Sequence, residues 1–174
     1  MKKFKEPHMG TIKSSELNSE IRRSAVLSPC DKYQYMLLRE WDAPLPCALL
    51  IGLNPSKADA RVDDQTIRKD IGFAKLWGCG SIMKGNLYGI RSTDPKGIFR
   101  VDDPVGPGND DALLEMRRMC QLVVFCWGSD KAADRRSGYV VRMFPDAKCL
   151  GKTAGGHPRQ TLYLPYNTPL ENYR

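Results

Sequence analysis

The sequence predicts an α/β fold: a three-layer α/β/α sandwich with a central, mostly parallel four-stranded sheet plus an N-terminal antiparallel strand. Apolar segments of strand length alternate with segments whose apolar residues recur at helical spacing, and this alternation is typical of right-handed βαβ units. The chain has 174 residues, 41% of them hydrophobic, which is near the usual length of one domain and enough to bury one sizeable core. We therefore expect a single domain.

The predicted domain begins with two neighbouring strands. Residues 1–30 are charged, Ser-rich and weakly periodic, so we expect a loosely structured arm there and the domain at residues 31–174. Residues 33–40 (YQYMLLRE), followed by turn-forming residues, predict the antiparallel strand. Residues 47–53 (CALLIGL) are apolar on both faces, which is typical of a central parallel strand.

Helical and strand patterns then alternate. Apolar residues recur at helical spacing between Asp64 and Gly78, which predicts a helix. Asp63 or Asp64 is the candidate N-cap of this helix, and Gly78 is expected to end it. The elements expected after it are a strand at 81–88, a helix capped by Asn109, a strand at 121–127, a helix at 131–144 and a short strand at 147–150. The expected inward-facing residues of the first two helices are Ile67, Ile71, Ala74, Ala112, Leu113 and Met116.

The charge of the chain favours a polyanionic partner. Lys and Arg number 27 against 20 Asp and Glu, which gives a net charge of +7. Solubility alone is the alternative explanation. No apolar run approaches the roughly 20 residues of a membrane span, and residues 1–10 lack the apolar stretch of a signal peptide. We expect a cytoplasmic protein.

The cysteines show no metal-binding spacing. There is no C-x-x-C pair and no nearby His that completes a zinc set, so we expect neither a metal site nor a cofactor. Six reduced thiols are expected, at Cys30, Cys47, Cys79, Cys120, Cys126 and Cys149.

Polar and glycine residues follow all four predicted parallel strands. The ends read GLNPS at 52–56, NLYG at 86–89, WGS at 127–129 and, after a short loop, GGHPR at 155–159. Turn chemistry explains any one of them. The carboxyl ends of parallel strands meet at one edge of the sheet, where ligands bind in folds of this kind. We therefore expect a site at this edge.

The motifs at these strand ends carry a resemblance. GLNPS resembles the first motif of the uracil-DNA glycosylase superfamily, particularly the GINP form of its mismatch-specific thymine and uracil branch, and GGHPR resembles the second motif, which opens His-Pro in several branches. Asn86 falls where members place a base-reading amide. The resemblance covers about residues 47–165. Over the whole chain the match is closer to an uncharacterised bacterial and phage family with LNPS-x-AD, DD-x-TIR and GHPR-x-x-LYLP motifs.

The resemblance implies a DNA glycosylase that hydrolyses the N-glycosidic bond of a flipped-out pyrimidine. Two departures are present. Arg159, Gln160 and Thr161 stand where the well-studied branches have a Ser-rich, phosphate-contacting stretch, and the four-cysteine iron–sulfur pattern of some branches is missing.

Three residues are the candidate catalytic groups. Asn54 offers a carbonyl that orients water, although an Asn before Pro is also an ordinary turn residue. His157 can donate a hydrogen bond to the base oxygen as charge accumulates there, the alternative being a loop histidine. Asp64 is a candidate base for the water, and helix capping competes with that role; Asp59 and Asp63 lie nearby.

The candidate substrate-binding residues are Gly52, Ser56, Asn86 and Phe73. In the uracil-selective branch a Tyr follows the Pro of the first motif and blocks C5 of the base, whereas Ser56 stands here, so a C5-modified pyrimidine, as in damaged or hypermodified phage DNA, is the expected substrate. Asn86 has donor and acceptor atoms for a base edge. Core packing is the ordinary role for Phe73, and base stacking is the alternative.

DNA is the expected partner, in single- or double-stranded form. The candidate phosphate contacts are Arg61, Arg68, Arg91, Lys152 and Arg159. Two other classes remain open. One is a metal-dependent nucleotide or nucleoside hydrolase that uses the Asp-rich loop, and the other is a non-catalytic nucleic-acid-binding protein of the same fold.

Overall fold

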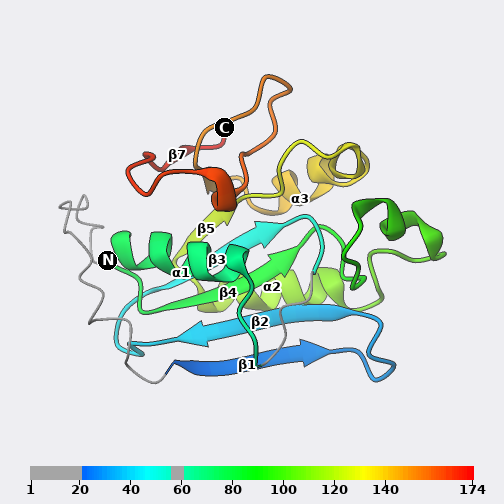
Figure 1. Cartoon of the computed structure of the whole chain (residues 1–174), viewed down its shortest axis with the longest axis horizontal. Helices are drawn as coiled ribbons and strands as arrows, with labels where there is room; N and C mark the ends of the chain where they lie inside the picture. The colour runs from blue at the N-terminus through cyan, green and yellow to red at the C-terminus, as the bar shows by residue number, and fades with distance from the viewer. Residues whose placement is uncertain (1–20, 56–60) are drawn as a thin grey trace.

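The centre of the fold is a mixed β-sheet. The computed structural model describes residues 21–55 and 61–174, and within them the sheet has seven strands in the order β1-β2-β4-β3-β5-β6-β7 (Figure 1). Strands β4, β3, β5 and β6 run parallel, while β1, β2 and β7 are antiparallel to their neighbours. The strands are β1 (Arg22–Leu27), β2 (Gln34–Glu40), β3 (Cys47–Gly52), β4 (Ser81–Asn86), β5 (Leu122–Phe125), β6 (Lys148–Cys149) and β7 (Glu171–Asn172).

Helices cover both faces of this sheet. Helix α1 (Gln65–Leu76) lies on one face and α2 (Asn109–Met119) on the other, as Figure 1 shows, and α3 (Ser137–Met143) packs into the core on the α2 side. Short 3₁₀ turns are η2 (Pro95–Arg100), η3 (Lys131–Arg135) and η4 (Thr161–Tyr163). The predicted three-layer α/β/α sandwich with a four-stranded parallel centre is confirmed.

Strand β3 shows why the core has two parts. Its residues are all buried, and alternate side chains point to opposite faces of a strand. Ala48 and Leu50 belong to the cluster under α1, whereas Leu49 and Ile51 belong to the cluster under α2 and α3. This two-sided burial explains the continuous apolar run that predicted a central strand.

The local signals for α1 are confirmed. Asp64 is the N-cap, and its side chain accepts a hydrogen bond from the backbone N–H of Ile67. Gly78 follows the helix with φ of 74°, a left-handed conformation that favours glycine. Among the residues expected to face inward, Ile67, Ile71 and Ala74 are all buried.

Three expectations about the elements are corrected. The arm expected over residues 1–30 includes β1, which pairs with β2 along its length and packs Ala25 on the α1-side core. Asn109 is not a cap, because Gly108 takes that position and the Asn109 side chain is buried against the end of β4. The helix expected at 131–144 is divided into η3 and α3 at Arg136.

The cysteines of the described residues are all free. No helix in residues 21–55 and 61–174 has the length and apolar character needed to cross a membrane.

Candidate functional site

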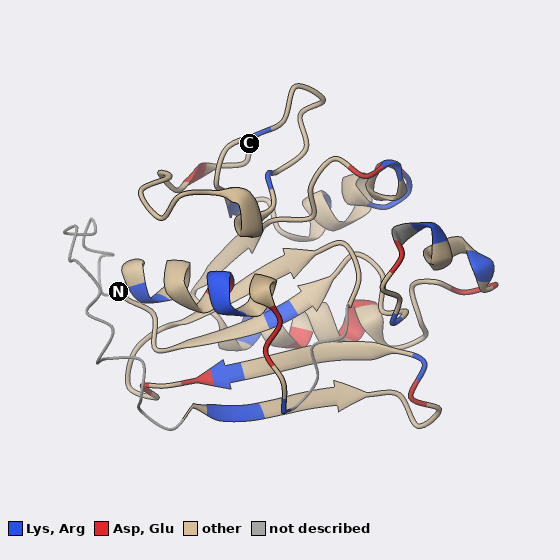
Figure 2. Cartoon of the chain, in the orientation of Figure 1, with Lys and Arg blue, Asp and Glu red and all other residues tan. Residues whose placement is uncertain are grey.

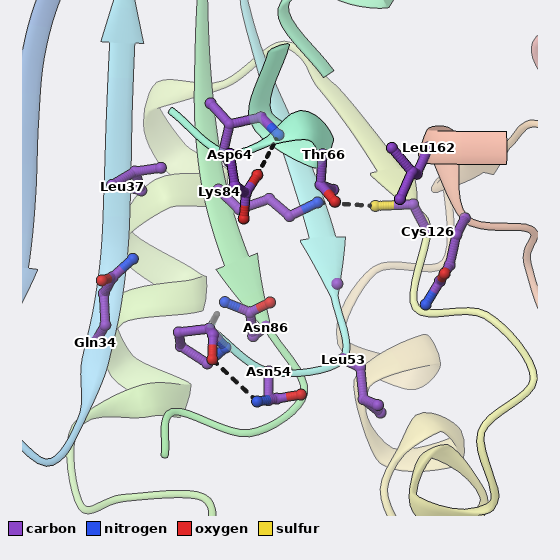
Figure 3. A pocket seen from close by; sticks show the side chains of 14 residues that line it. Gln34, Leu37, Leu53, Asn54, Asp64, Thr66, Lys84, Asn86, Cys126 and Leu162 are labelled. Atoms are coloured by element: carbon purple, nitrogen blue, oxygen red, sulfur yellow. Dashed lines mark hydrogen bonds between the residues drawn. The ribbon is translucent and has the colours of Figure 1, made fainter. Parts of the chain in front are cut away.

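A cavity of about 190 Å³, lined by apolar and polar side chains and called the polar cavity below for its polar groups, lies at the carboxyl edge of the sheet, on the face covered by α1 (Figure 3). The ends of β3 and β4, the start of β2, the first turn of α1 and residues 160–162 contribute to its wall. The sequence-predicted residues that it brings together are Gly52, Asn54, Asp64 and Asn86. The edge of the sheet at which the strand ends were predicted to meet therefore contains a cavity.

Gly52 makes room for the polar side chains of the neighbouring strand. It pairs with Asn86 in the parallel register of β3 and β4. A Cβ atom on Gly52 would lie 2.8 Å from Asn86 Oδ1 and 3.2 Å from Lys84 Cε. The absence of a side chain lets the Asn86 amide and the Lys84 ammonium lie over the end of β3.

The Asn54 side chain is held by the main chain of a loop. Its Nδ2 donates to the carbonyl of Ser92 at 2.7 Å and to that of Pro55 at 3.0 Å. With both amide hydrogens used, Oδ1 is the acceptor that remains for a ligand or a water molecule.

Two adjacent aspartates anchor the start of α1 beside the cavity. Asp64 Oδ1 accepts from the backbone N–H of Ile67 at 2.8 Å and also lines the cavity. Asp63 pairs at 2.5 Å with Arg39, whose side chain is fully buried, and at 3.1 Å with Arg23. Asp63 therefore holds the start of α1 against β1 and β2 through its ion pairs, whereas Asp64 is the aspartate that lines the cavity.

Two primary amides, those of Gln34 and Asn86, line the cavity and are 4% and 5% exposed. The side-chain oxygen of Gln34 is buried and has no hydrogen-bond partner among the described residues. An unmade hydrogen bond in a buried position costs about 1–3 kcal/mol. A ligand with complementary donors and acceptors would remove this cost.

Lys84 adds a buried positive charge. Its Nζ donates to Asp70 Oδ2 at 2.8 Å and to Cys126 Sγ at 3.3 Å, and the second Asp70 oxygen accepts from Thr161 Oγ1 at 2.6 Å. Burial alone would lower the pKa of Lys84, but the charge of Asp70 and its hydrogen bond with the ammonium raise it above its ordinary value. Burial raises the pKa of Cys126 to about 11, and the ammonium partly offsets this. The charged form of Lys84 is therefore the stable one.

Two predicted residues are not brought to the cavity, and a third lies outside the described residues. His157 Nε2 lies 3.0 Å from Asp134 Oδ1, and His157 is not among the described residues that line the wall. Phe73 is fully buried and packs against Trp77 and Tyr166, so its ring belongs to the core rather than to a stacking surface. Ser56 lies outside the described residues, as does Asp59.

The candidate phosphate contacts lie on α1 and on several loops. Arg61 is exposed, Arg68 donates to the Asp63 carbonyl, and Arg91 donates to the carbonyl of Asp31. Figure 2 shows Lys and Arg on α1, on β1 and on these loops. The basic charge is therefore not confined to one element.

The last two candidates follow β6. Lys152 Nζ lies 5.3 Å from the ring centroid of Tyr173. Arg159 is exposed and, with Tyr163, lines an open hollow of about 530 Å³. Gln160 lines both this hollow and the polar cavity, so the two are adjacent.

Sequence reasoning missed Gln34, Lys84 and Asp70. Lys84 stands two residues before Asn86 in a buried strand, and Asp70 lies at helical spacing between inward-facing residues of α1. A charged residue at an expected core position is the signal that would have found both. Across the described ranges, 21–55 and 61–174, no group of three or more His, Cys, Asp or Glu is arranged to hold a metal ion.

The fold and the cavity define an α/β domain with a preformed cavity at the carboxyl edge of its parallel strands. Residues 34–160 match the family described as "Protein of unknown function (DUF1643)", and the chain belongs to this family. The match extends from the start of β2 to Gln160 and so includes most of the cavity wall. No curated protein and no solved structure matches the chain.

Proposed function

We propose that this protein is a DNA glycosylase that hydrolyses the N-glycosidic bond of a flipped-out, C5-modified pyrimidine and leaves an abasic site. The observation that carries the proposal is the cavity in which Gly52, Asn54, Asp64 and Asn86 come together beside the unpaired side-chain oxygen of Gln34. Its position at the end of parallel strands agrees with the resemblance to the uracil-DNA glycosylase superfamily on the GLNPS motif.

The size and chemistry of the cavity suit a single base. Its volume of about 190 Å³ lies below the roughly 300–1,000 Å³ of drug-sized sites, so it accepts one small ring and leaves the sugar outside. An amide carries both donor and acceptor atoms, and so does the edge of a pyrimidine. Gln34 and Asn86 offer two such groups from neighbouring strands.

The reaction needs water and an anion stabiliser. The oxygen of water forms a bond to C1′ of the sugar, the bond between C1′ and the base nitrogen breaks, and its electron pair leaves with the base. A proton from the attacking water is transferred to a general base of the protein, and the departing nucleobase is later protonated. The products are the free base and an abasic sugar. Positioning the water and stabilising the developing charge are the tasks of the protein.

Asn54 and Asp64 are placed for the water. The main chain fixes the Asn54 amide so that its oxygen remains as an acceptor, and the Asp64 carboxylate lines the same cavity. In the proposed mechanism Asn54 orients the water and Asp64 receives its proton. The capping hydrogen bond to Ile67 holds the carboxylate in place and uses one of its oxygens.

The charge of the chain supports DNA as the partner. The net charge of +7 favours a polyanion, and basic residues flank the loops that surround the cavity. A base inside a duplex cannot reach a cavity of this kind, so the nucleotide must be flipped out or already single-stranded.

The test is to detect the released base. The protein is incubated with single- and double-stranded DNA that contains uracil, thymine, hydroxymethylated or glycosylated pyrimidines, and the products are examined for free base by mass spectrometry and for alkali-labile sites. We expect release from the C5-modified DNAs. DNA binding without release from any substrate would contradict the glycosylase and favour a non-catalytic nucleic-acid-binding protein. Activity abolished by a chelator would favour a metal-dependent hydrolase.

A further inference from the structure

Lys84 supplies the one cationic side chain that lines the polar cavity among the described residues. It lies on the α1 face of β4, two residues before Asn86, and its side chain extends across the cavity toward Cys126 (Figure 3). Its Nζ would lie 3.4 Å from a Cβ on Gly52, so the glycine keeps the ammonium uncovered at the end of β3.

The ammonium is fixed from two sides. Asp70 on α1 accepts from it at 2.8 Å, and Cys126 beyond β5 at 3.3 Å. Thr161 holds the other Asp70 oxygen, so the carboxylate has little freedom to rotate. A lysine ammonium has three hydrogens, and these two partners use two of them. One donor therefore remains for a group in the cavity.

A purely structural role does not account for this arrangement. A buried ion pair adds little stability over well-packed apolar side chains, because removing both charges from water is costly. Here the pair also adjoins a cavity, and the same wall contains Asn86 and the buried Gln34 Oε1, which has no hydrogen-bond partner among the described residues. The Lys84 ammonium therefore borders a cavity with further polar groups in addition to its own two partners.

We propose that Lys84 is the anion-stabilising group of the site. It donates a hydrogen bond to a carbonyl oxygen of the bound base, so the cavity selects oxo-pyrimidines and holds them most tightly when the ring carries negative charge. This inference rests on the proposed function and deepens it. It assigns to Lys84 the role that the sequence motif suggested for His157, which faces Asp134 instead.

The electrostatics of the wall agree with this role. Asp70 is fully buried behind the ammonium, so the positive end of the pair is the end nearer the cavity. The N-terminus of α1 also borders the cavity, but its cap Asp64 already supplies a negative charge there. Lys84 is therefore the group in the wall that would stabilise a ring departing with the electrons of the broken bond.

Binding of two small rings tests the inference without turnover. Barbiturate is an oxo-pyrimidine that is an anion at neutral pH, and thymine is a neutral ring of similar size. Isothermal titration calorimetry measures both against the full chain, Lys84→Met, Asn86→Ala and the control Lys148→Met, whose lysine pairs with Asn172 at β7. We expect wild type to bind barbiturate more tightly than thymine. Lys84→Met should weaken barbiturate binding by roughly 10- to 100-fold, the worth of a hydrogen bond to a charged group, and thymine binding much less.

A second variant distinguishes a loss of binding from a loss of folding. Lys84→Met leaves the Asp70 carboxylate buried without its partner, whereas Lys84→Met/Asp70→Asn removes both charges. The double variant should unfold cooperatively and still show the selective loss of barbiturate binding.

The outcomes separate the two proposals. If Asn86→Ala weakens binding of both rings while the Lys84 variants keep the preference for barbiturate, the role of Lys84 is overturned and base binding stands. If wild type binds neither ring yet releases base from DNA, the role of Lys84 is overturned and the glycosylase stands. If it binds neither ring and releases no base, both proposals fail.

Discussion

Lys84 Nζ lies 2.8 Å from Asp70 Oδ2, and this buried ion pair joins the central strand β4 to helix α1 directly beneath the polar cavity. Thr161 extends the connection to the C-terminal segment through the second Asp70 oxygen. One network therefore holds a strand, a helix and a loop in the positions that form the cavity.

Removing one partner of this pair should destabilise the fold. Asp70→Ala leaves the Lys84 ammonium buried without its carboxylate, and the expected loss is about 3–5 kcal/mol in the free energy of unfolding. Urea unfolding at neutral pH measures it. Asp146→Ala, which breaks the exposed pair with Arg117, is the control and should cost about 1 kcal/mol or less. Equal stability of Asp70→Ala and wild type would show that the network does not hold the fold.

Loss of the fixed amide in the first motif should reduce base release. Asn54→Ala removes the acceptor that orients water, and we expect the rate to fall by roughly 10²–10³-fold with the fold intact, as when a preorganised polar group is removed from an active site. Asn167→Ala, an identical change at an exposed residue, is the control. Single-turnover release from the best modified DNA gives the rate. A wild-type rate in Asn54→Ala would make this residue a turn residue only.

DNA affinity should depend steeply on salt. Log affinity should fall linearly with log salt concentration, and Arg159→Ala should reduce the slope by about 1 and weaken binding to all sequences alike, because phosphate contacts carry no base information. Fluorescence anisotropy with labelled DNA measures the slope. Arg118→Ala is the control, since Arg118 pairs with Glu115 on α2, across the sheet from the cavity. A flat salt response in wild type would exclude DNA as the main partner.

Substrate selectivity should change at the residue after Pro55. The resemblance proposed above puts Ser56 where the uracil-selective branch has a Tyr that blocks C5, so Ser56→Tyr should suppress release of C5-substituted pyrimidines far more than it alters DNA binding. Base release is measured on two otherwise identical DNAs, one with uracil and one with a hydroxymethylated pyrimidine, and the ratio of the two rates gives the selectivity. Ser56→Ala serves as the small-residue control. Equal release of plain uracil and bulky bases by wild type would refute the selectivity while leaving the glycosylase proposal in place.

One cysteine should react much faster than the others. The hydrogen bond with Ser28 lowers the pKa of the exposed Cys30 thiol, so more Cys30 is thiolate at pH 8 than in an ordinary thiol. Burial raises the pKa of Cys79 to about 12, which keeps that thiol protonated. Iodoacetamide labelling followed by mass spectrometry should therefore modify Cys30 first, and Ser28→Ala should slow it. Earlier labelling of Cys79 would contradict the buried core described above.

Much of the fold followed from short-range patterns. The apolar run at β3 reflects burial on both faces, and the cap at Asp64 and the stop at Gly78 depend on residues within one turn of α1. The polar ends of the parallel strands meet at one edge by topology alone. Gly52, Asn54 and Asn86 could therefore be assigned to a common site from the sequence.

Other features depended on packing between distant segments. The pairing of β1 with β2 turned part of an expected arm into an edge strand, and packing of the C-terminal segment on α1 placed Phe73 in the core. His157 was predicted to be catalytic from the resemblance of its motif, yet its side chain lies against Asp134. No local pattern contains these long-range contacts.

By itself, the sequence determined the layers of the fold, the cap of α1 and the edge of the sheet where the site lies, because hydrophobic period and capping are local properties of the chain. Only the tertiary structure decided which polar groups line the cavity. Gln34, Lys84 and Gln160 lie far apart in the sequence, and Asp70 meets Lys84 through the packing of a helix on a strand. Their positions depend on hydrogen bonds and ion pairs between different helices and strands, and these form only when the layers pack together.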